Sequence, residues 1–284
     1  MKTLIISGLP VARVAPAAGG PAVASALRTA LRVLHRANPA LSATGWLNVG
    51  LAALAVAGLL LDHRLVTGAP VWLKPLKFAL SITAYAWTLG WLLADLPGPA
   101  QRSVRRLSAG VALSMAVEQA VIFVQAGRGT TSHYNVATAL DGLLFGLMGI
   151  FIALNTALTV WALYLVWRHR PHGPASYVWG VRWGLLVFIA GSLVGGAMIH
   201  LGQHTVGAPD GGPGLPGLGW STRAGDLRAA HFLGMHALQA LPLLGWALSR
   251  RVPRRAVGLV GAGALAYAAL VAGLLAWALH GRPL

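Results

Sequence analysis

Long apolar runs, separated by short polar segments rich in arginine, are the dominant pattern of this chain. Seven of these runs are close to the roughly 20 residues that a helix needs to cross the hydrocarbon core of a bilayer. They lie at about 43–61, 76–94, 107–126, 139–166, 183–202, 227–248 and 256–279. The predicted fold class is therefore all-α, an integral membrane bundle of about seven transmembrane helices, with residues 41–280 as a single bundle.

Residues 1–40 differ from the rest, because they are rich in Ala, Gly and Pro with scattered Arg. Their first apolar stretch is short, is broken at Gly8–Pro10 and is closed by Arg13, which makes it a poor signal peptide. We expect a partly disordered cytoplasmic tail that ends in a surface helix around Ser25–His35.

Composition supports membrane insertion and excludes several other classes. The chain is 56% hydrophobic and 10% charged, whereas soluble domains carry about 25% charged residues, so the lipid bilayer is the expected partner. The net charge of +16 comes from basic clusters between apolar runs, which argues against nucleic-acid binding. The absence of cysteine excludes disulfides, thiol catalysis and iron–sulfur ligation. Abundant Arg, Ala and Gly are typical of a GC-rich bacterium, which favours the bacterial plasma membrane.

The distribution of Lys and Arg predicts the orientation, because cytoplasmic segments carry an excess of these residues. With the N-terminus inside, the inner segments hold fifteen: Lys2, Arg13, Arg28, Arg32, Arg36, Arg102, Arg105, Arg106, Arg168, Arg170, Arg182, Arg250, Arg251, Arg254 and Arg255. The outer segments hold seven: Arg64, Lys74, Lys77, Arg128, Arg223, Arg228 and Arg282. We therefore expect a cytoplasmic N-terminus and an external C-terminus, as an odd number of spans requires.

Three polar side chains are expected deep in the bundle. With a rise of about 1.5 Å per residue, Glu118, His236 and Tyr85 lie about 12 to 15 Å below the outer ends of their spans. An ionisable residue at that depth usually faces the bundle interior and marks a pathway or site. The structural alternative for Glu118 is a protonated carboxyl group that joins two helices, and for His236 a neutral imidazole bonded to a carbonyl freed by Pro242.

Further polar residues surround these three on the outer side and complete a predicted outward-opening ligand site. They are Gln125, Arg128, His133, Asp141, His231, Arg228, Lys74 and Lys77. Asp141 follows Thr138 at the spacing of a capping box, and Asp226 has the position of an N-cap, so capping is the favoured interpretation for both. The two lysines either reach to lipid headgroups or form an anion-binding entrance.

Paired histidines raise the alternative of a metal or haem site. His200 and His204 are four residues apart and could share a helix face, with His231 as a third ligand. No spacing fixes that third ligand, so ordinary interfacial histidines are favoured, and a bound haem or divalent metal stays an open alternative.

The third outer loop, roughly residues 204–226, is long for a connection in a compact bundle. Its Pro and Gly residues favour fixed turns, and Trp220 could hold it against the bundle as a lid. The alternative is a mobile surface loop.

The segments WLKPLKF, QAGRGTTSHYN and GDLRAAHFLGMHALQALP resemble an uncharacterised group of bacterial multi-pass membrane proteins. This resemblance covers most of residues 60–250. It implies a membrane location and no assigned activity.

Three classes of function remain open from the residues alone. The first, which we favour, is a carrier or a membrane protein that binds a small molecule or ion, with Glu118 as the proton- or cation-linked group. The second is a haem- or metal-binding redox protein that uses His200, His231 or His236. The third is an intramembrane enzyme with Glu118 and His236 as acid and base on a lipid-linked substrate.

Overall fold

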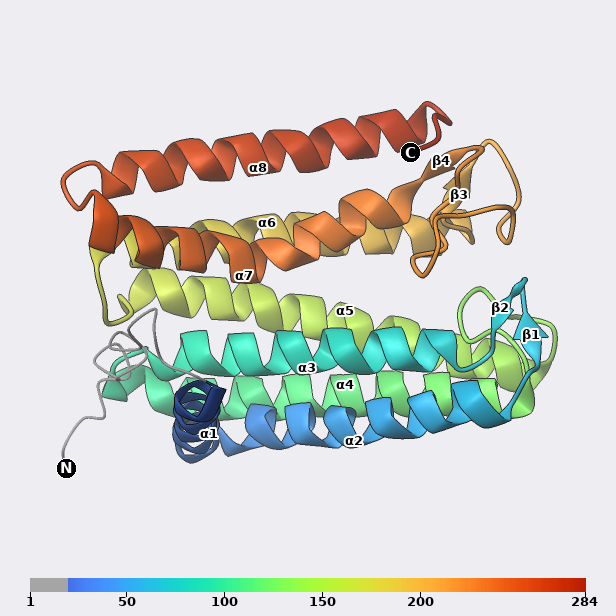
Figure 1. Ribbon diagram of the computed structural model, residues 1–284, viewed down its shortest axis with the longest axis horizontal. Helices are drawn as coiled ribbons and strands as arrows, with labels where there is room; N and C mark the ends of the chain where they lie inside the picture. Colours follow the sequence, from blue (N-terminus) through green and yellow to red (C-terminus); the bar gives the residue numbers. More distant parts are fainter. Residues whose placement is uncertain (1–19) are drawn as a thin grey trace.

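The computed structural model, which describes residues 20–284, confirms an all-α bundle of seven helices that are long and apolar enough to cross a membrane (Figure 1). They are α2 (Pro39–Leu61), α3 (Leu73–Ala94), α4 (Gln101–Arg128), α5 (Ala139–Arg168), α6 (Ala175–Leu201), α7 (Leu227–Arg251) and α8 (Ala256–Leu279). We call the end with the loops after α2, α4 and α6 the outer end, and the opposite end the inner end.

The largest difference from the predicted spans is the start of α6, at Ala175 instead of 183. Arg182 lies inside this helix, where its guanidinium group makes cation–π contacts with two tryptophan rings. Its guanidinium carbon is 4.3 Å from the ring centroid of Trp167 and 5.0 Å from that of Trp179. At the membrane boundary a cation stacked on two indole rings has a lower free energy than a cation without such contacts. The helix α6 can therefore include Arg182.

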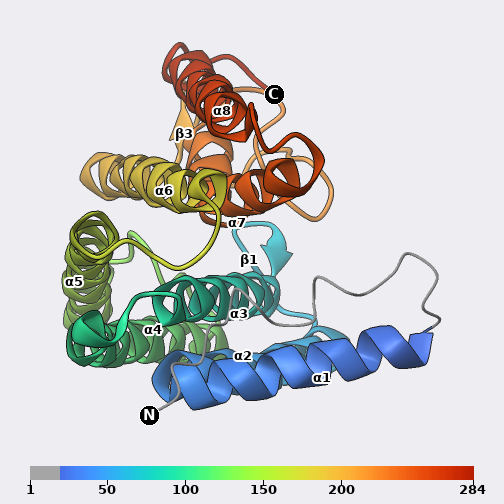
Figure 2. The same ribbon diagram turned by 90° about the vertical axis from the view of Figure 1, so that its left-hand side faces the viewer.

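The helix α1 (Gly20–Ala37) confirms the expected surface helix and extends it. It is seen end-on in Figure 1 and lengthwise in Figure 2, so it runs across the bundle axis at the inner end. Leu34 is 2% exposed and lies with Leu41 beside Gly90 of α3, which fixes this helix to the bundle. The tail predicted for residues 1–19 lies outside the described residues.

The outer loops contain short paired strands instead of open coil. β1 (Leu65–Val66) pairs antiparallel with β2 (Ala69–Pro70), and β3 (Thr205–Val206) pairs antiparallel with β4 (Gly225–Asp226). At the inner end a 3₁₀ turn, η3 (Gly98–Ala100), joins α3 to α4. The long loop before α7 therefore returns to its own start, which brings both of its ends to the mouth of the bundle.

The helices form two groups joined through α5 and α6. Figure 2 shows α2, α3 and α4 on one side, α6, α7 and α8 on the other, and α5 along one edge. Glycines let α6 and α7 approach closely, because a Cβ atom added to Gly234 would lie 2.6 Å from the Cα atom of Gly191. The main core spans both groups, with Leu89 and Leu93 of α3 and Leu185 and Phe188 of α6 fully buried.

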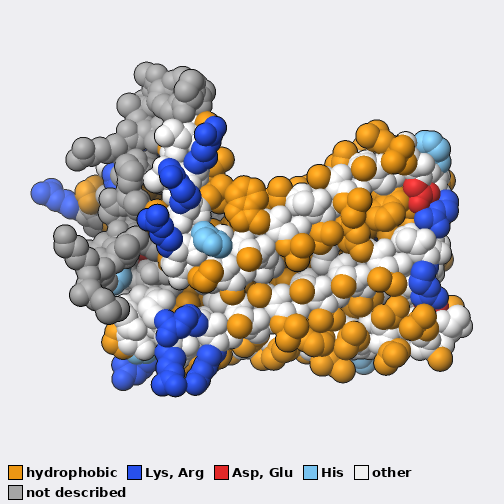
Figure 3. Space-filling model, turned by 90° about the horizontal axis from the view of Figure 1, so that it is seen from below, with side chains coloured by type: hydrophobic (Ala, Val, Ile, Leu, Met, Phe, Trp, Pro, Cys, Tyr) orange, Lys and Arg blue, Asp and Glu red, His pale blue; other side chains and the backbone are white. Residues whose placement is uncertain are grey.

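The surface pattern matches a membrane protein. In the face shown in Figure 3, hydrophobic side chains cover the middle of the bundle, while Lys and Arg gather towards the two ends. Large apolar side chains remain exposed on the helices, including Leu143, Ile150, Leu193 and Leu265. Exposed leucines and isoleucines in a continuous band are expected where the surrounding solvent is lipid.

Candidate functional site

The chain has six acidic residues, and four of them are held by a basic side chain at the outer end. The pairs are Asp62 with Arg64 at 2.6 Å, Asp141 with Arg128 at 2.5 Å, Asp226 with Arg228 at 2.6 Å, and Asp210 with His204 at 3.1 Å. In each pair the basic side chain neutralises the carboxylate and holds a loop or a helix end in position. The two acids outside this scheme are Glu118 in α4 and Asp95 after α3.

Glu118 is buried, with 5% of its surface exposed, as predicted. Its nearest basic partner is the His133 ring, whose Nε2 lies 3.6 Å from Glu118 Oε1. Within the described residues its second oxygen, Oε2, is buried and has no hydrogen-bond partner. A carboxyl group that only joins two helices would have its oxygens satisfied by those helices, so this arrangement leaves binding capacity free.

The depth predicted for Glu118 relative to Tyr85 is wrong. The adjacent residue Gln119 donates from Nε2 to the carbonyl of Pro75 at 3.3 Å, which places this part of α4 beside the first turn of α3. Tyr85 is ten residues further along α3, about 15 Å deeper. The error arises because α4 continues past the start of α3, so a depth counted from the end of α4 places Glu118 too far inside.

His133 reaches Glu118 because the loop between α4 and α5 folds back into the bundle. Its ring is 5.5 Å from the ring of Phe78 and 6.4 Å from that of Phe145. The next residue, Tyr134, has a φ of 58° and packs against the buried cluster that includes Met198 and Leu227. A tyrosine in the left-handed region is uncommon and costs free energy, so tertiary contacts must hold this loop in place.

The electrostatic surroundings of the loop favour neutral side chains. Burial holds the pKa of His133 well below its usual value, and the charges of Lys74, His204 and His231 lower it further. Burial also raises the pKa of Tyr134 to about 12. His133 is therefore a neutral imidazole at physiological pH, with one nitrogen able to accept a proton.

Lys74 supplies the positive charge of this region. Its ammonium group is 5.9 Å from the ring centroid of Phe78 and is near enough to Glu118 for the two charges to attract each other. Lys74, Glu118 and His133, which we call the outer cluster, come from α3, α4 and the loop after α4. The cluster thus combines an acid, a base and a cation within a largely apolar setting.

Gln125, Arg128 and Asp141 form a separate network at the junction of α4 and α5. Gln125 donates to Asp141 Oδ1 at 2.8 Å, and Arg128 donates to both Gln125 and Asp141. Thr138 Oγ1 accepts from the backbone N–H of Asp141 at 3.2 Å, which confirms the predicted cap. Because these partners satisfy one another, the network holds the helix ends together.

The third outer loop packs on the bundle, as predicted. Lys77 of α3 donates to the carbonyl of Leu218 at 2.9 Å, and Arg228 donates to that of Gly219 at 2.6 Å. The Trp220 ring is 5.5 Å from the ring of Phe232 in α7. Asp226 accepts from the Arg228 backbone, which confirms the predicted N-cap of α7. The loop therefore connects α7 to α3 across the mouth of the bundle.

Tyr85 is deep in the bundle, but its partners were not predicted. Its hydroxyl is 3.1 Å from both Asn155 Oδ1 and Thr159 Oγ1 of α5, and its ring stacks on Phe188 at 5.1 Å. The helical spacing of Asn155 and Thr159, four residues apart in an apolar span, is the sequence signal that could have identified them. This trio has the form of a structural link between α3 and α5.

His236 is half-buried in α7, with its ring 4.3 Å from that of Phe232. One turn further along, Gln239 donates to Thr88 Oγ1 of α3 at 3.3 Å. His236 therefore lies near the level of Tyr85, as predicted, and well below the outer cluster. Its predicted role in a pathway stays a prediction.

The three histidines considered for metal binding do not converge. His231 donates from Nδ1 to the carbonyl of Gly191, more than two turns of α6 before His200, and His200 is exposed. His204 instead contacts Asp210. In the described part of the chain no group of three or more His, Asp or Glu side chains is arranged to hold a metal ion.

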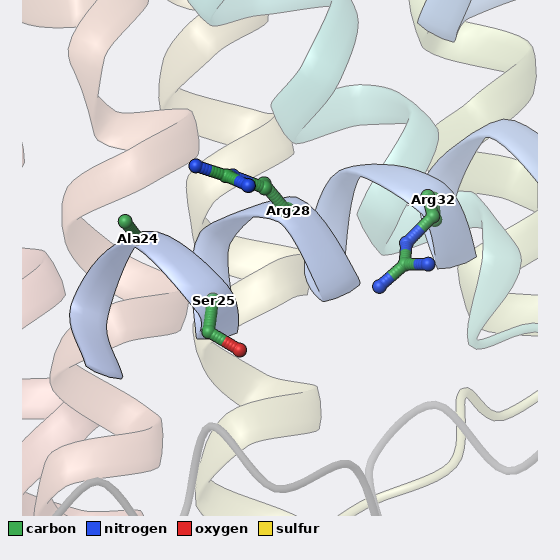
Figure 4. Close-up of a pocket in the computed structure, with 4 residues that line it drawn as sticks. All are labelled: Ala24, Ser25, Arg28 and Arg32. Atoms are coloured by element: carbon green, nitrogen blue, oxygen red, sulfur yellow. The ribbon is translucent and has the colours of Figure 1, made fainter. Parts of the chain in front are cut away.

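A shallow recess at the inner end lies apart from these residues. Figure 4 shows it on α1, where it is lined by Ala24, Ser25, Arg28 and Arg32. The described residues that line it belong to one helix and include no acid, so we do not assign it to the functional site.

Comparisons with protein-family models, with curated proteins and with solved structures give no match to this chain.

Proposed function

We propose that this chain is a carrier in the plasma membrane of a bacterium, and that the outer cluster of Lys74, Glu118 and His133 binds a small ligand or ion with exchange of a proton. The membrane location rests on the seven apolar helices. The composition and the arginine distribution support the bacterial plasma membrane.

The observation that carries the proposal is the Glu118 carboxyl group. It is buried, its Oε2 has no partner among the described residues, and its Oε1 is 3.6 Å from a histidine on a loop. The other acids at the outer end are bonded to basic groups at 2.5 to 3.1 Å. An incompletely satisfied buried carboxyl group is costly, and such groups in membrane proteins usually serve in ion or proton binding.

The chemistry of the three groups suits a proton-linked ligand. Ionised Glu118 offers two acceptor oxygens, and Lys74 offers a donor with a positive charge. A ligand that carries a donor and an acceptor can satisfy both. When Glu118 takes up a proton, one acceptor is lost and its attraction to the ligand weakens, so ligand and proton binding are coupled. The neutral imidazole of His133 can pass that proton to or from the carboxyl group.

The third outer loop supports a carrier over a simple binding protein. It joins α7 to α3 through the bonds of Lys77 and Arg228 to loop carbonyls, so it links the two helical groups at the mouth of the bundle. If those groups move relative to each other, this loop has to open or close. Carriers commonly work by such rocking of one group of helices against another around a fixed site.

The test uses purified protein in detergent and compares Glu118→Gln with Asp62→Asn, which removes an outer carboxylate paired with Arg64. Thermal unfolding is measured with sodium, potassium, chloride or phosphate over a range of pH. An ion at about a hundred times its Kd stabilises the folded state by about 2.7 kcal/mol. We expect at least one ion to give a pH-dependent shift in wild type and in Asp62→Asn, and none in Glu118→Gln.

Proteoliposomes provide the matching transport measurement. Uptake of the stabilising ion, driven by an imposed pH gradient, should be present for wild type and lost for Glu118→Gln. A Glu118→Gln protein that binds and transports as wild type does would refute the proposal. If no ion of the panel stabilises wild type, a carboxyl infrared band that titrates in wild type and vanishes in Glu118→Gln would still support proton binding, and its absence would count against it.

A further inference from the structure

Asp95, the second acid outside the basic pairs, is at the opposite end of the bundle from Glu118. It is the C-cap of α3 and stands just before the turn that leads to α4. Although it lies in a connection at the inner end, only 2% of its surface is exposed. Within residues 20–284 no Lys, Arg or His nitrogen contacts its carboxyl group, whereas each of the other five acids has such a contact.

Its contacts come from the loop before α6 and from α6 itself. The Tyr177 hydroxyl donates to Asp95 Oδ2 at 2.6 Å, and the backbone N–H of His172 donates to the Asp95 carbonyl at 2.8 Å. These bonds join the end of α3 to the start of α6, and so connect the two helical groups. The contact is long-range in sequence, since 82 positions separate Asp95 and Tyr177.

Two buried polar atoms beside these bonds remain without partners in the described residues. They are Asp95 Oδ1 and His172 Nε2. A carboxylate oxygen can only accept, so Asp95 Oδ1 would need a donor, and the described residues supply none. A proton on the carboxyl group removes the charge from this buried, unpartnered group.

Electrostatics agrees with proton uptake by this group. Burial raises the pKa of Asp95 to about 6, while the hydrogen bond from Tyr177 and the charge of His172 act in the lowering direction. The amide of Gln101, at the start of α4, is directed to the carbonyls of Leu93 and Leu96 instead. Tyr177 and His172 are therefore the ionisable groups that act on Asp95.

We propose that Asp95 and Tyr177 form a proton-binding site at the inner end of the bundle, in which the buried carboxyl group takes up a proton while its Oδ2 accepts from the Tyr177 hydroxyl. Loss of the proton leaves a buried carboxylate whose only side-chain donor among the described residues is Tyr177. The site shares no residue with the outer cluster, and fully buried leucines of α3 lie between the two levels.

The test is infrared difference spectroscopy of the purified, full-length protein titrated from mildly acidic to mildly alkaline pH. Glu118→Gln is the background, so that the outer carboxyl group does not contribute. We expect one protonated carboxyl band that disappears as the pH rises through mild acidity. Adding Asp95→Asn should abolish the band. Adding Tyr177→Phe should keep it but move its titration to higher pH, because the donor that stabilises the carboxylate is lost.

Tyr164→Phe is the matched control, since this tyrosine is 59% exposed on α5. It should leave the titration unchanged. The proposal is overturned if the band persists in Asp95→Asn, or if Tyr177→Phe titrates as the background protein does. If Asp95→Asn does not fold, the comparison of Tyr177→Phe with Tyr164→Phe decides alone. Because the outer acid is already replaced, this result is separate from the outcome for the proposed carrier function.

Discussion

His133 Nε2 and Glu118 Oε1 lie 3.6 Å apart, although one residue belongs to an outer loop and the other to the buried face of α4. The loop reaches this depth because His133 and Tyr134 pack against Phe78 and Phe145. A loop residue can change its position more readily than a helix residue. The pair therefore places the proposed proton exchange at a part of the molecule that can respond to ligand binding.

The first prediction concerns the pH dependence of stability. The folded protein holds the pKa of His133 well below its usual value, so the unfolded chain binds a proton that the folded protein does not. The stability from this group is complete above the ordinary pKa of histidine and falls as the pH is lowered. Each unit of pKa difference corresponds to about 1.4 kcal/mol. We expect His133→Gln to reduce the loss of thermal stability between neutral and mildly acidic pH.

His63→Gln is the control for this measurement, because His63 is an exposed outer-loop residue. It should keep the wild-type dependence on pH. Equal slopes for wild type and His133→Gln would show that His133 titrates alike in the folded and unfolded protein, contrary to its buried position.

The second prediction concerns the loop that covers the mouth of the bundle. The Trp220 ring contacts Phe232, and the backbone of the loop accepts from Lys77 and Arg228. Trp220→Ala should accelerate backbone amide exchange within residues 208–219, because the aromatic contact that orders the loop is removed. Trp246→Ala is the control, since this tryptophan is 38% exposed and packs near Arg250 at the inner end. Unchanged exchange in Trp220→Ala would mean that the two carbonyl contacts are sufficient.

The third prediction concerns the contact of α6 with α7. A Cβ atom at Gly234 would lie 2.6 Å from the Cα atom of Gly191, and backbone atoms cannot move aside at little cost. Gly234→Ala should destabilise the protein by about 1 to 3 kcal/mol, the usual range for overpacking. Gly258→Ala is the matched control in α8, where an added Cβ meets nothing within 4 Å. Thermal unfolding in detergent measures both, and a Gly234→Ala protein as stable as Gly258→Ala would contradict the close packing.

Local sequence signals predicted the helices and their caps well. Apolar length identified all seven spans, and the spacing of Thr138 and Asp141 identified a cap that the structure confirms. Depth was less predictable, because it depends on how far each helix extends past its neighbours. Glu118 shows this, since the position of Gln119 beside Pro75 is set by the packing of α4 on α3 and not by residues near Glu118.

The inner site was not predicted, for a related reason. Asp95 follows an apolar span and precedes Pro97, which is the ordinary pattern of a short exposed connection. Its burial comes from Tyr177 and from the loop at His172, both far away in sequence. No periodicity or spacing links these residues, so only the folded arrangement brings them together.

The last prediction tests the orientation on which the terms outer and inner rest. Lys and Arg are more than twice as numerous in the segments assigned to the cytoplasm, which predicts that the loop before α7 is external and the turn between α7 and α8 internal. The chain has no cysteine, so a single introduced thiol reports its own position. Arg223 and Arg254 suit this purpose because both are exposed, one in each connection. In intact cells a membrane-impermeant maleimide should label Arg223→Cys, whereas Arg254→Cys should react only after the membrane is permeabilised.

Labelling of Arg254→Cys alone would show that the bundle has the opposite orientation. The Glu118 cluster would then lie on the cytoplasmic side, where the proposed carrier would take up its ligand from within the cell. Labelling of both in intact cells would mean that the chain between them does not cross the membrane as α7, which would remove the basis for the two opposite proton-binding ends.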